Sequence, residues 1–132
     1  MNTMRMRIRL EQYLNRIFSL IFSRQDANVE ELLLTDKHRI DEGIIRAQLR
    51  FWDESILEIR EDLIVQQEII IKYRYTYHYQ KGNQVLFRYD NSAHHPHLAN
   101  FPYHKHTADG EVIPAAPPDL REILHEIDSI LY

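Results

Sequence analysis

Residues 69–90 read Ile-Ile-Ile-Lys-Tyr-Arg-Tyr-Thr-Tyr-His-Tyr-Gln-Lys-Gly-Asn-Gln-Val-Leu-Phe-Arg-Tyr-Asp. On both sides of Lys81-Gly82-Asn83, apolar side chains alternate with polar ones, and a period of two is typical of a strand with one buried face. The β-branched and aromatic residues at the apolar positions favour strands, and a glycine between polar residues suits a tight turn. The stretch therefore predicts a long antiparallel hairpin, around which the rest of the chain is interpreted.

The residues before the hairpin repeat the same pattern. Apolar and polar side chains alternate over residues 45–52, a turn is predicted at 53–55, and residues 57–60 continue the alternation. Residues 29–35 are predicted as a further strand. After the hairpin the chain contains five prolines, which we expect to keep it out of regular sheet: Pro96, Pro102, Pro114, Pro117 and Pro118.

Helices are predicted at both ends of the chain. Apolar residues recur at helical spacing over residues 10–21 and again over 120–131. Asp119, with Glu122 three residues later, matches an N-cap and capping-box pair. The predicted fold class is therefore α+β: an antiparallel β-meander of four to five strands with an N-terminal and a C-terminal amphipathic helix, forming one domain over residues 1–132.

The composition limits the classes of protein to which the chain can belong. The 132 residues include no cysteine, which suits a cytoplasmic protein without disulfides or thiolate metal sites. No apolar core of a secretory signal follows the arginines at the N-terminus, and no run approaches the roughly 20 apolar residues that span a bilayer. The sequence therefore predicts a cytoplasmic protein that does not enter membranes.

The predicted strands place their charged side chains on one face. The net charge of −4 is unevenly distributed, because residues 107–132 hold six acidic side chains and one arginine, so the rest of the chain is weakly basic. Alternation collects on the polar face of the sheet Arg46, Arg50, Arg60, Lys72, Arg74, Thr76, His78 and Arg88, with Glu58 and Asp90. Such a face either keeps a half-exposed sheet soluble or binds phosphodiesters.

The segment after the hairpin is rich in histidine. Five of the eight histidines fall between residues 90 and 106, namely His94, His95, His97, His104 and His106. Three interpretations remain open: proton transfer, a metal site, or structural hydrogen bonding to loop carbonyls around Pro96 and Pro102.

In the first interpretation the histidines carry out acid–base chemistry on RNA. Metal-free RNA cleavage needs a base for the 2′-hydroxyl, an acid for the leaving oxygen, and cations for the charged phosphorane. The candidate catalytic residues are His94, His95, His104 and His106, with Asp90 orienting a ring. The candidate RNA- or phosphate-binding residues are Arg74, Arg88, Lys105, His78 and Asn91. No cofactor or metal is required.

In the second interpretation two His-x-His elements close a zinc site. His95 projects with His97, and His104 projects with His106, while Asp90 supplies an oxygen or orients a ring nitrogen. The chain would then be a binding or regulatory module without chemistry, docking a metal ion or a protein partner.

Residues in this part of the chain also resemble a known family. The stretches that carry the resemblance are Tyr-Arg-Tyr-Thr-Tyr-His-Tyr-Gln (73–80), Leu-Phe-Arg-Tyr-Asp-Asn (86–91), His-His-Pro (94–96) and Phe-Pro-Tyr-His-Lys-His (101–106). They resemble the TumE-like family, small bacterial and archaeal toxins of two-gene toxin–antitoxin modules. Where the family commonly has Ala-Pro and a histidine, this chain has Ser92-Ala93 and Tyr103.

The resemblance implies a growth-inhibiting protein that a cognate antitoxin neutralises. The residues that the resemblance implies are functional are those at the matching positions: Arg88, Asp90, Asn91, His94, His95, His104 and His106. Because RNA is a common target of such toxins, the resemblance and the residues together predict an endoribonuclease, a hydrolase whose partners are RNA and the antitoxin. A homodimer is left open.

Overall fold

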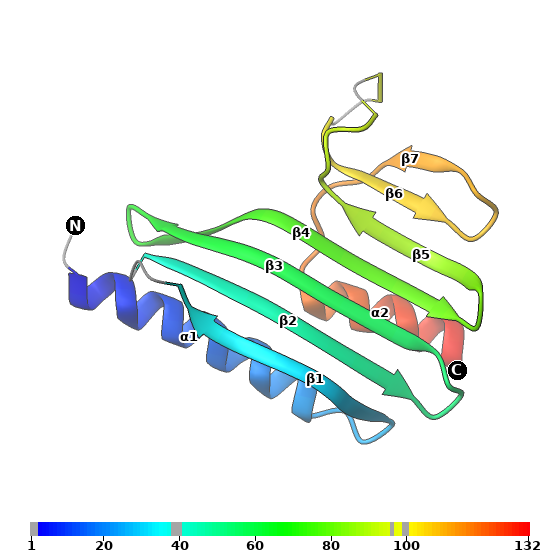
Figure 1. Cartoon of the computed structure of the whole chain (residues 1–132), viewed down its shortest axis with the longest axis horizontal. Helices are drawn as coiled ribbons and strands as arrows, with labels where there is room; N and C mark the ends of the chain where they lie inside the picture. Colours follow the sequence, from blue (N-terminus) through cyan, green and yellow to red (C-terminus); the bar gives the residue numbers. More distant parts are fainter. Residues whose placement is uncertain (1–2, 38–40, 96, 99–100) are drawn as a thin grey trace.

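Seven antiparallel strands form a single sheet, and two helices cover one of its faces, in the residues that the computed structural model describes (3–37, 41–95, 97–98 and 101–132). The chain runs through α1 (Thr3–Phe22), β1 (Ala27–Asp36), β2 (Glu42–Phe51), β3 (Ile56–Gln66), β4 (Ile69–Lys81), β5 (Gln84–Asp90), β6 (His104–Thr107), β7 (Val112–Pro114) and α2 (Leu120–Leu131). The strands lie in the sheet in their order along the chain, as in a meander (Figure 1). The predicted α+β class is confirmed.

The number of strands differs from the prediction of four to five. Besides the five predicted strands, β6 and β7 extend the sheet within the segment in which prolines were expected to prevent it. Both strands are short and lie at one end of the sheet. Pro114 is the last residue of the edge strand β7, where a missing N–H costs no ladder hydrogen bond.

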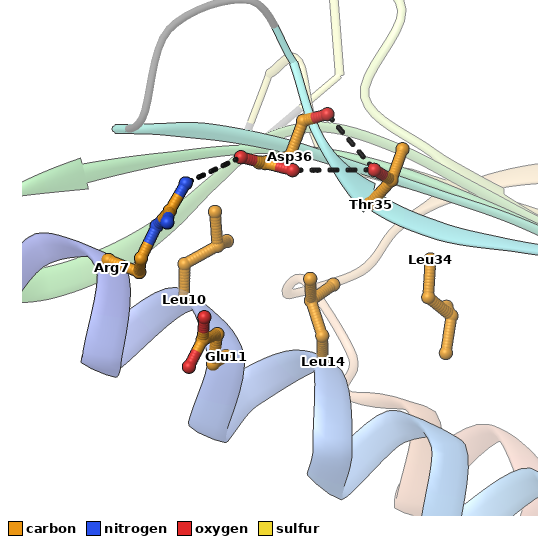
Figure 2. Close-up of a pocket in the computed structure, with 7 residues that line it drawn as sticks. All are labelled: Arg7, Leu10, Glu11, Leu14, Leu34, Thr35 and Asp36. Carbon is orange, nitrogen blue, oxygen red and sulfur yellow. Dashed lines mark hydrogen bonds and ion pairs between the residues drawn. The ribbon is translucent and has the colours of Figure 1, made fainter.

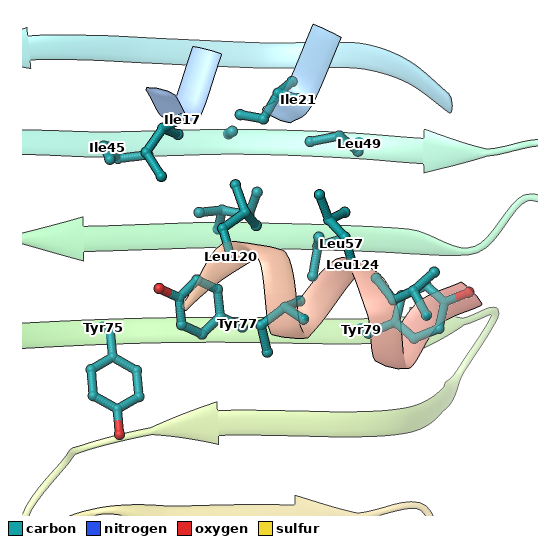
Figure 3. Packing of buried hydrophobic residues seen from close by; sticks show 14 of the residues in the cluster. Ile17, Ile21, Ile45, Leu49, Leu57, Tyr75, Tyr77, Tyr79, Leu120 and Leu124 are labelled. Atoms are coloured by element: carbon teal, nitrogen blue, oxygen red, sulfur yellow. The ribbon is translucent and has the colours of Figure 1, made fainter. Parts of the chain in front are cut away.

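The core lies between the sheet and the helices. Figure 3 shows Ile17 and Ile21 of α1 over Ile45 and Leu49 of β2. In the same view Leu120 and Leu124 of α2 lie over the part of the sheet that carries Tyr77 and Tyr79 of β4. As predicted, Asp119 is the N-cap of α2, and its side chain accepts a hydrogen bond from the backbone N–H of Glu122 at 2.9 Å. Both helices therefore pack on one face, and the other face is open.

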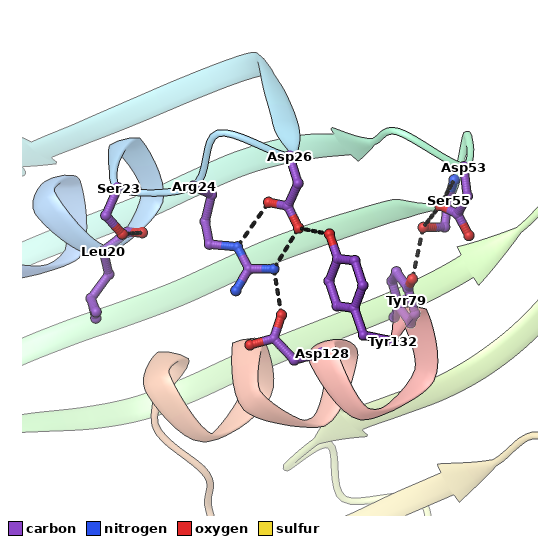
Figure 4. Close-up of polar contacts among 9 residues, drawn as sticks. All are labelled: Leu20, Ser23, Arg24, Asp26, Asp53, Ser55, Tyr79, Asp128 and Tyr132. Atoms are coloured by element: carbon purple, nitrogen blue, oxygen red, sulfur yellow. Dashed lines mark hydrogen bonds and ion pairs between the residues drawn. The ribbon is translucent and has the colours of Figure 1, made fainter.

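A polar network joins the ends of the two helices. Arg24, in the turn after α1, donates to Asp128 of α2 at 2.6 Å and to Asp26 at 2.8 Å, and the hydroxyl of Tyr132 also donates to Asp26 (Figure 4). The side chain of Arg24 is 16% exposed, so these charge-assisted bonds are partly shielded from water. They hold the C-terminal end of α2 against the turn that enters β1.

A β-bulge in β4 reverses the predicted alternation near its start. Asp62 pairs with Arg74, whereas Leu63 pairs with Lys72, so Tyr73 is an extra residue in the register. An extra residue moves the preceding side chains to the other face. Lys72, expected on the open face, therefore lies on the helix side, where it donates to the hydroxyl of Tyr77 and the carbonyl of Pro118.

Candidate active site

Strand pairing between β5 and β6 brings two histidines to a carboxylate and a guanidinium. Asp90 lies opposite His104, and Arg88 lies opposite His106. Directly opposite residues in antiparallel strands project to the same face. Arg88 also lies opposite His78 of β4, so all of these side chains occupy the open face that the helices leave uncovered.

Asp90 is at the centre of the site. Only 4% of this residue is exposed, and its carboxylate accepts bonds from Nε of Arg88 at 2.8 Å and from the N–H and hydroxyl of Ser92 at 3.0 and 2.9 Å. Burial alone raises the pKa of Asp90, but the bonds from Arg88 and Ser92 and the nearby His104 outweigh it and leave the pKa below its usual range. Asp90 is therefore ionised at neutral pH.

His104 is the most buried of the histidines at this site, with 2% of its surface exposed. Its Nδ1 lies 2.9 Å from the carbonyl oxygen of Pro102, an acceptor, so this nitrogen carries a proton. Its Nε2 lies 2.8 Å from Oδ1 of Asp90 and has no hydrogen-bond partner among the described residues. A proton or a cation at Nε2 would satisfy both this nitrogen and the carboxylate.

Three rings form what we call the histidine cluster: His95, His104 and His106. Their ring centroids lie 5.0–5.7 Å apart in edge-on contacts, and one ligand nitrogen from each lies within 4.8 Å of the others. Nε2 of His106 is 3.9 Å from Oδ2 of Asp90. Burial lowers the pKa of His106 below its usual 6.5; Asp90 opposes this, while His104 and Arg88 add to it. His106 is therefore neutral at pH 7 and able to accept a proton.

His78 belongs to the same surface but makes different contacts. Its Nδ1 lies 3.2 Å from Nη1 of Arg88, which only donates, and its Nε2 lies 2.9 Å from the side-chain oxygen of Gln80. The neutral ring with its proton on Nε2 satisfies both contacts. His78 thus contacts Nη1 of the Arg88 guanidinium, while Nε of the same group donates to Asp90.

A depression of about 450 Å³ in the open face adjoins Asp90. It is lined by Tyr73, Arg74, Tyr75, Thr76, Arg88, Asp90, Asn91, Ser92 and Ala93. The structure thus brings Arg74, Arg88 and Asn91 together beside the buried carboxylate. The side chain of Asn91 also accepts from the N–H of Tyr75 and donates to the carbonyl of Tyr73, so it ties the start of the loop after β5 to β4.

Lys105, expected to bind phosphate, lies on the other face. It alternates between His104 and His106 within β6, so its side chain points toward α2, where it donates to Glu126 at 2.8 Å. Its ammonium also lies 5.0 Å from the ring centroid of Tyr89. The zinc interpretation already placed His104 and His106 on the same side of the chain, but the expectation for Lys105 did not apply that alternation to the residue between them.

Two further histidines lie outside the histidine cluster. His94 is exposed in a turn. His97 is also exposed, and its ring lies 6.0 Å from that of His95. The structure therefore does not place His94 with the other candidate catalytic residues. Pro96, between these histidines, lies outside the described residues.

Sequence reasoning missed two groups that shape the site. Ser92 donates twice to Asp90, and the carbonyl of Pro102 sets the orientation of the His104 ring. The Asp-x-Ser spacing of residues 90–92 is typical of a side chain that accepts a bond from the backbone two residues later, so it was a usable signal for Ser92. No comparable signal pointed to the carbonyl of Pro102, because every residue has a backbone carbonyl.

Another cavity lies between α1 and β1 and has a different character. It holds about 270 Å³ and is lined by Arg7, Leu10, Glu11, Leu14, Leu34, Thr35 and Asp36 (Figure 2). An ion pair of 3.6 Å joins Arg7 to Asp36 beside it. These residues include no imidazole, and α1 and β1 lie at the opposite side of the sheet from β6, so this cavity is separate from the histidine cluster.

The fold and the site define a class: an α+β protein whose antiparallel meander presents histidine, carboxylate and guanidinium groups on its uncovered face. A family model described as "Toxin TumE" matches residues 17–131, and the chain belongs to this toxin family. Comparison with curated proteins and with solved structures found no match. Within the described part of the chain, neither helix has the length and apolar character needed to cross a bilayer.

Proposed function

We propose that this chain is the toxin of a toxin–antitoxin module and acts on RNA as an endoribonuclease that requires no metal ion. The observation that carries the proposal is the convergence of the histidine cluster with Asp90 and Arg88 on one open face. Metal-free cleavage of RNA needs a base, an acid and a cation within reach of one phosphate; the histidines can serve as the base and the acid, Arg88 as the cation, and Asp90 can orient them.

In the proposed reaction the neutral ring of His106 accepts the proton of a ribose 2′-hydroxyl. The 2′-oxygen then attacks phosphorus, the bond to the 5′-oxygen breaks, and protonated His95 donates to that leaving oxygen. The products are a 2′,3′-cyclic phosphate and a 5′-hydroxyl end. Arg88, whose side chain is 40% exposed, stabilises the charged phosphorane, while Asp90 and the buried His104 position the other groups.

The activity of the proposed enzyme should fall in acid with a midpoint below pH 6.5. Because burial holds the pKa of His106 below 6.5, the ring loses its capacity to accept a proton only below that pH. The measurement is kcat/KM for a short labelled RNA between pH 4.5 and 8. An acid limb centred at 6.5 or higher would contradict His106 as the base.

A second candidate function has a specific observation in its favour. Neutral imidazole nitrogens are common zinc ligands, and the three nitrogens of the histidine cluster lie within 4.8 Å of one another. Nε2 of His104 is buried with no hydrogen-bond partner among the described residues, and it faces a carboxylate able to serve as a further ligand. A binding module that docks a metal ion without cleaving RNA would use the same residues.

Removal of metal separates the two candidates. After dialysis against EDTA, with chelator kept in the assay, the protein should cleave RNA at an unchanged rate and contain far less than one zinc per chain by elemental analysis. This result is expected because imidazoles transfer protons without a metal. Loss of cleavage on chelation, restored by added zinc, would contradict the metal-independent reaction, and bound zinc with no effect on RNA would support the binding module.

The proposed partner is an antitoxin that covers the open face. Acidic side chains or a disordered acidic segment would pair with the arginines of that face and block RNA at the same time. An RNA target and a chain without cysteine agree with action in the cytoplasm. Co-expression with the neighbouring gene of the module should restore growth that this chain alone inhibits.

A further inference from the structure

A row of side chains crosses the open face and ends at the histidine cluster. Arg46 of β2 pairs with Arg60 of β3, Arg60 with Thr76 of β4, Thr76 with Asp90, and Asp90 with His104. Neighbouring strands lie about 4.8 Å apart, so the row spans roughly 19 Å at right angles to the strands. It is too long for a single phosphate and suits a short oligonucleotide.

Two depressions follow this row. The smaller, of about 200 Å³, is lined by Arg46, Arg60, Asp62, Arg74, Tyr75 and Thr76. The larger, of about 450 Å³, shares Arg74, Tyr75 and Thr76 with it and continues to Arg88 and Asp90. The shared residues make a nearly continuous trough from β2 to the buried carboxylate.

The arginines along the trough differ in how far their charge is neutralised. Arg46 donates to Asp62 at 2.8 Å, and Arg88 donates to Asp90 at the same distance. Arg74 lies 3.8 Å from Asp62 with 75% of its side chain exposed. Arg60 is exposed and has no ion-pair partner within the described part of the chain. Arg60 and Arg74 therefore keep guanidinium groups available for phosphates.

The bulge in β4 adds an aromatic wall to the trough. Tyr73, the extra residue of the bulge, is 41% exposed and lines the larger depression beside Arg74. An exposed aromatic ring next to arginines is the combination on which unpaired bases stack while their phosphates are neutralised. A duplex keeps its bases stacked inside and would not use such a ring.

We propose that single-stranded RNA binds across the strands along this trough, with the scissile phosphate at the histidine cluster and upstream or downstream phosphates on Arg74 and Arg60. The inference rests on the proposed action on RNA and names the form of the substrate. Arg60 lies three strands from His104, roughly 14 Å away, so only a chain of several nucleotides reaches it. Arg60 is thus a length-dependent binding residue outside the reacting groups.

The chain offers a matched control in Arg50. This arginine lies on the same strand and face as Arg46, but it is near the end of β2 and away from the row. It forms ion pairs with Glu30 and Glu54. Arg60→Ala and Arg50→Ala remove the same charge from the same face. Only the first removes a guanidinium that has no ion-pair partner among the described residues.

The test measures binding of fluorescein-labelled deoxyuridine oligonucleotides of 2 and 10 nucleotides by fluorescence anisotropy across a salt series. These probes lack the 2′-hydroxyl and are not cleaved. Arg60→Ala should weaken binding of the 10-mer about 3–10-fold, reduce the salt slope by about 0.7, and leave the 2-mer unchanged. Arg50→Ala should leave both probes unchanged.

The outcomes distinguish a failure of the proposed binding path from a failure of the proposed cleavage reaction. Equal losses for the two variants, equal losses for the two lengths, or no binding of the 10-mer would overturn the trough as the binding path. Cleavage of an RNA 10-mer that Arg60→Ala does not slow would also overturn it, while leaving the endoribonuclease intact. Binding that depends on Arg60, in a protein that cleaves no RNA, would support the path and contradict the reaction.

Discussion

Replacing His106 with alanine should lower the proposed RNA cleavage by about 100-fold or more and relieve the growth inhibition that we propose for this toxin. General acid–base catalysis by one positioned side chain contributes about 10²–10⁴-fold in rate, and His106 is the member of the histidine cluster whose pKa is held low for accepting a proton. Its side chain is 33% exposed, so truncation should leave the fold intact. The measurements are kcat for a labelled RNA and colony formation under induced expression.

The control for this variant is His125→Ala. His125 lies on α2, on the face of the sheet opposite the histidine cluster, and its loss should change neither cleavage nor toxicity. His95→Ala should resemble His106→Ala, because the acid is as necessary as the base. Full toxicity of both cluster variants, with unfolding midpoints close to that of the parent protein, would remove the proposed mechanism.

Glu61→Ala should lower the free energy of unfolding by about 3–5 kcal/mol, the largest stability effect that we expect for a charged residue in this protein. Glu61 is fully buried, and its carboxylate accepts bonds from the hydroxyls of Tyr13 on α1 and Tyr77 on β4. The ammonium of Lys72 in turn donates to the hydroxyl of Tyr77. Removing the carboxylate leaves the two tyrosine hydroxyls without their acceptor, and it takes away a negative charge near the partly buried ammonium of Lys72. Chemical denaturation followed by circular dichroism measures the change.

Glu58→Ala is the matched control for the stability effect. Glu58 is on the same strand as Glu61 but exposed on the open face, and exposed substitutions usually change stability by no more than about 0.5 kcal/mol. Similar losses for the two variants would show that the buried network contributes nothing beyond a surface carboxylate. Tyr77→Phe tests the same network while keeping the ring, and it should fall between the two.

Most of the architecture followed from local patterns. The alternation over residues 69–90 predicted β4, β5 and their turn, and the helical spacing predicted α1 and α2. The strands β6 and β7 were missed because they are four and three residues long, too short to be assigned as strands by alternation alone, and because proline was treated as excluding sheet. Proline is tolerated at a sheet edge, which is where β7 lies.

The candidate site was predicted in part. The concentration of histidines near Arg88 and Asp90 was visible in the chain, and the structure brings His95, His104 and His106 to that pair. Lys105 was expected beside the phosphate-binding residues, and this placement was wrong. Alternation within β6 turns its side chain toward α2 instead. Lys72 was wrongly placed because the bulge at Tyr73 shifts the alternation by one residue, and nothing in the pattern of Tyr and Ile residues marks where an extra residue enters.

Taken alone, the amino-acid pattern determined the α+β class, the helix-covered and open faces of most strands, and the residue types that act on RNA in our proposal. These properties depend on hydrophobic periodicity and turn residues, which are local. Tertiary structure decided which imidazoles lie near Asp90. It also placed Lys72 and Lys105 on the helix side of the sheet and aligned Arg46 and Arg60 with His104. Those relations depend on the register between strands far apart along the chain, and register is set by packing of the whole sheet against α1 and α2.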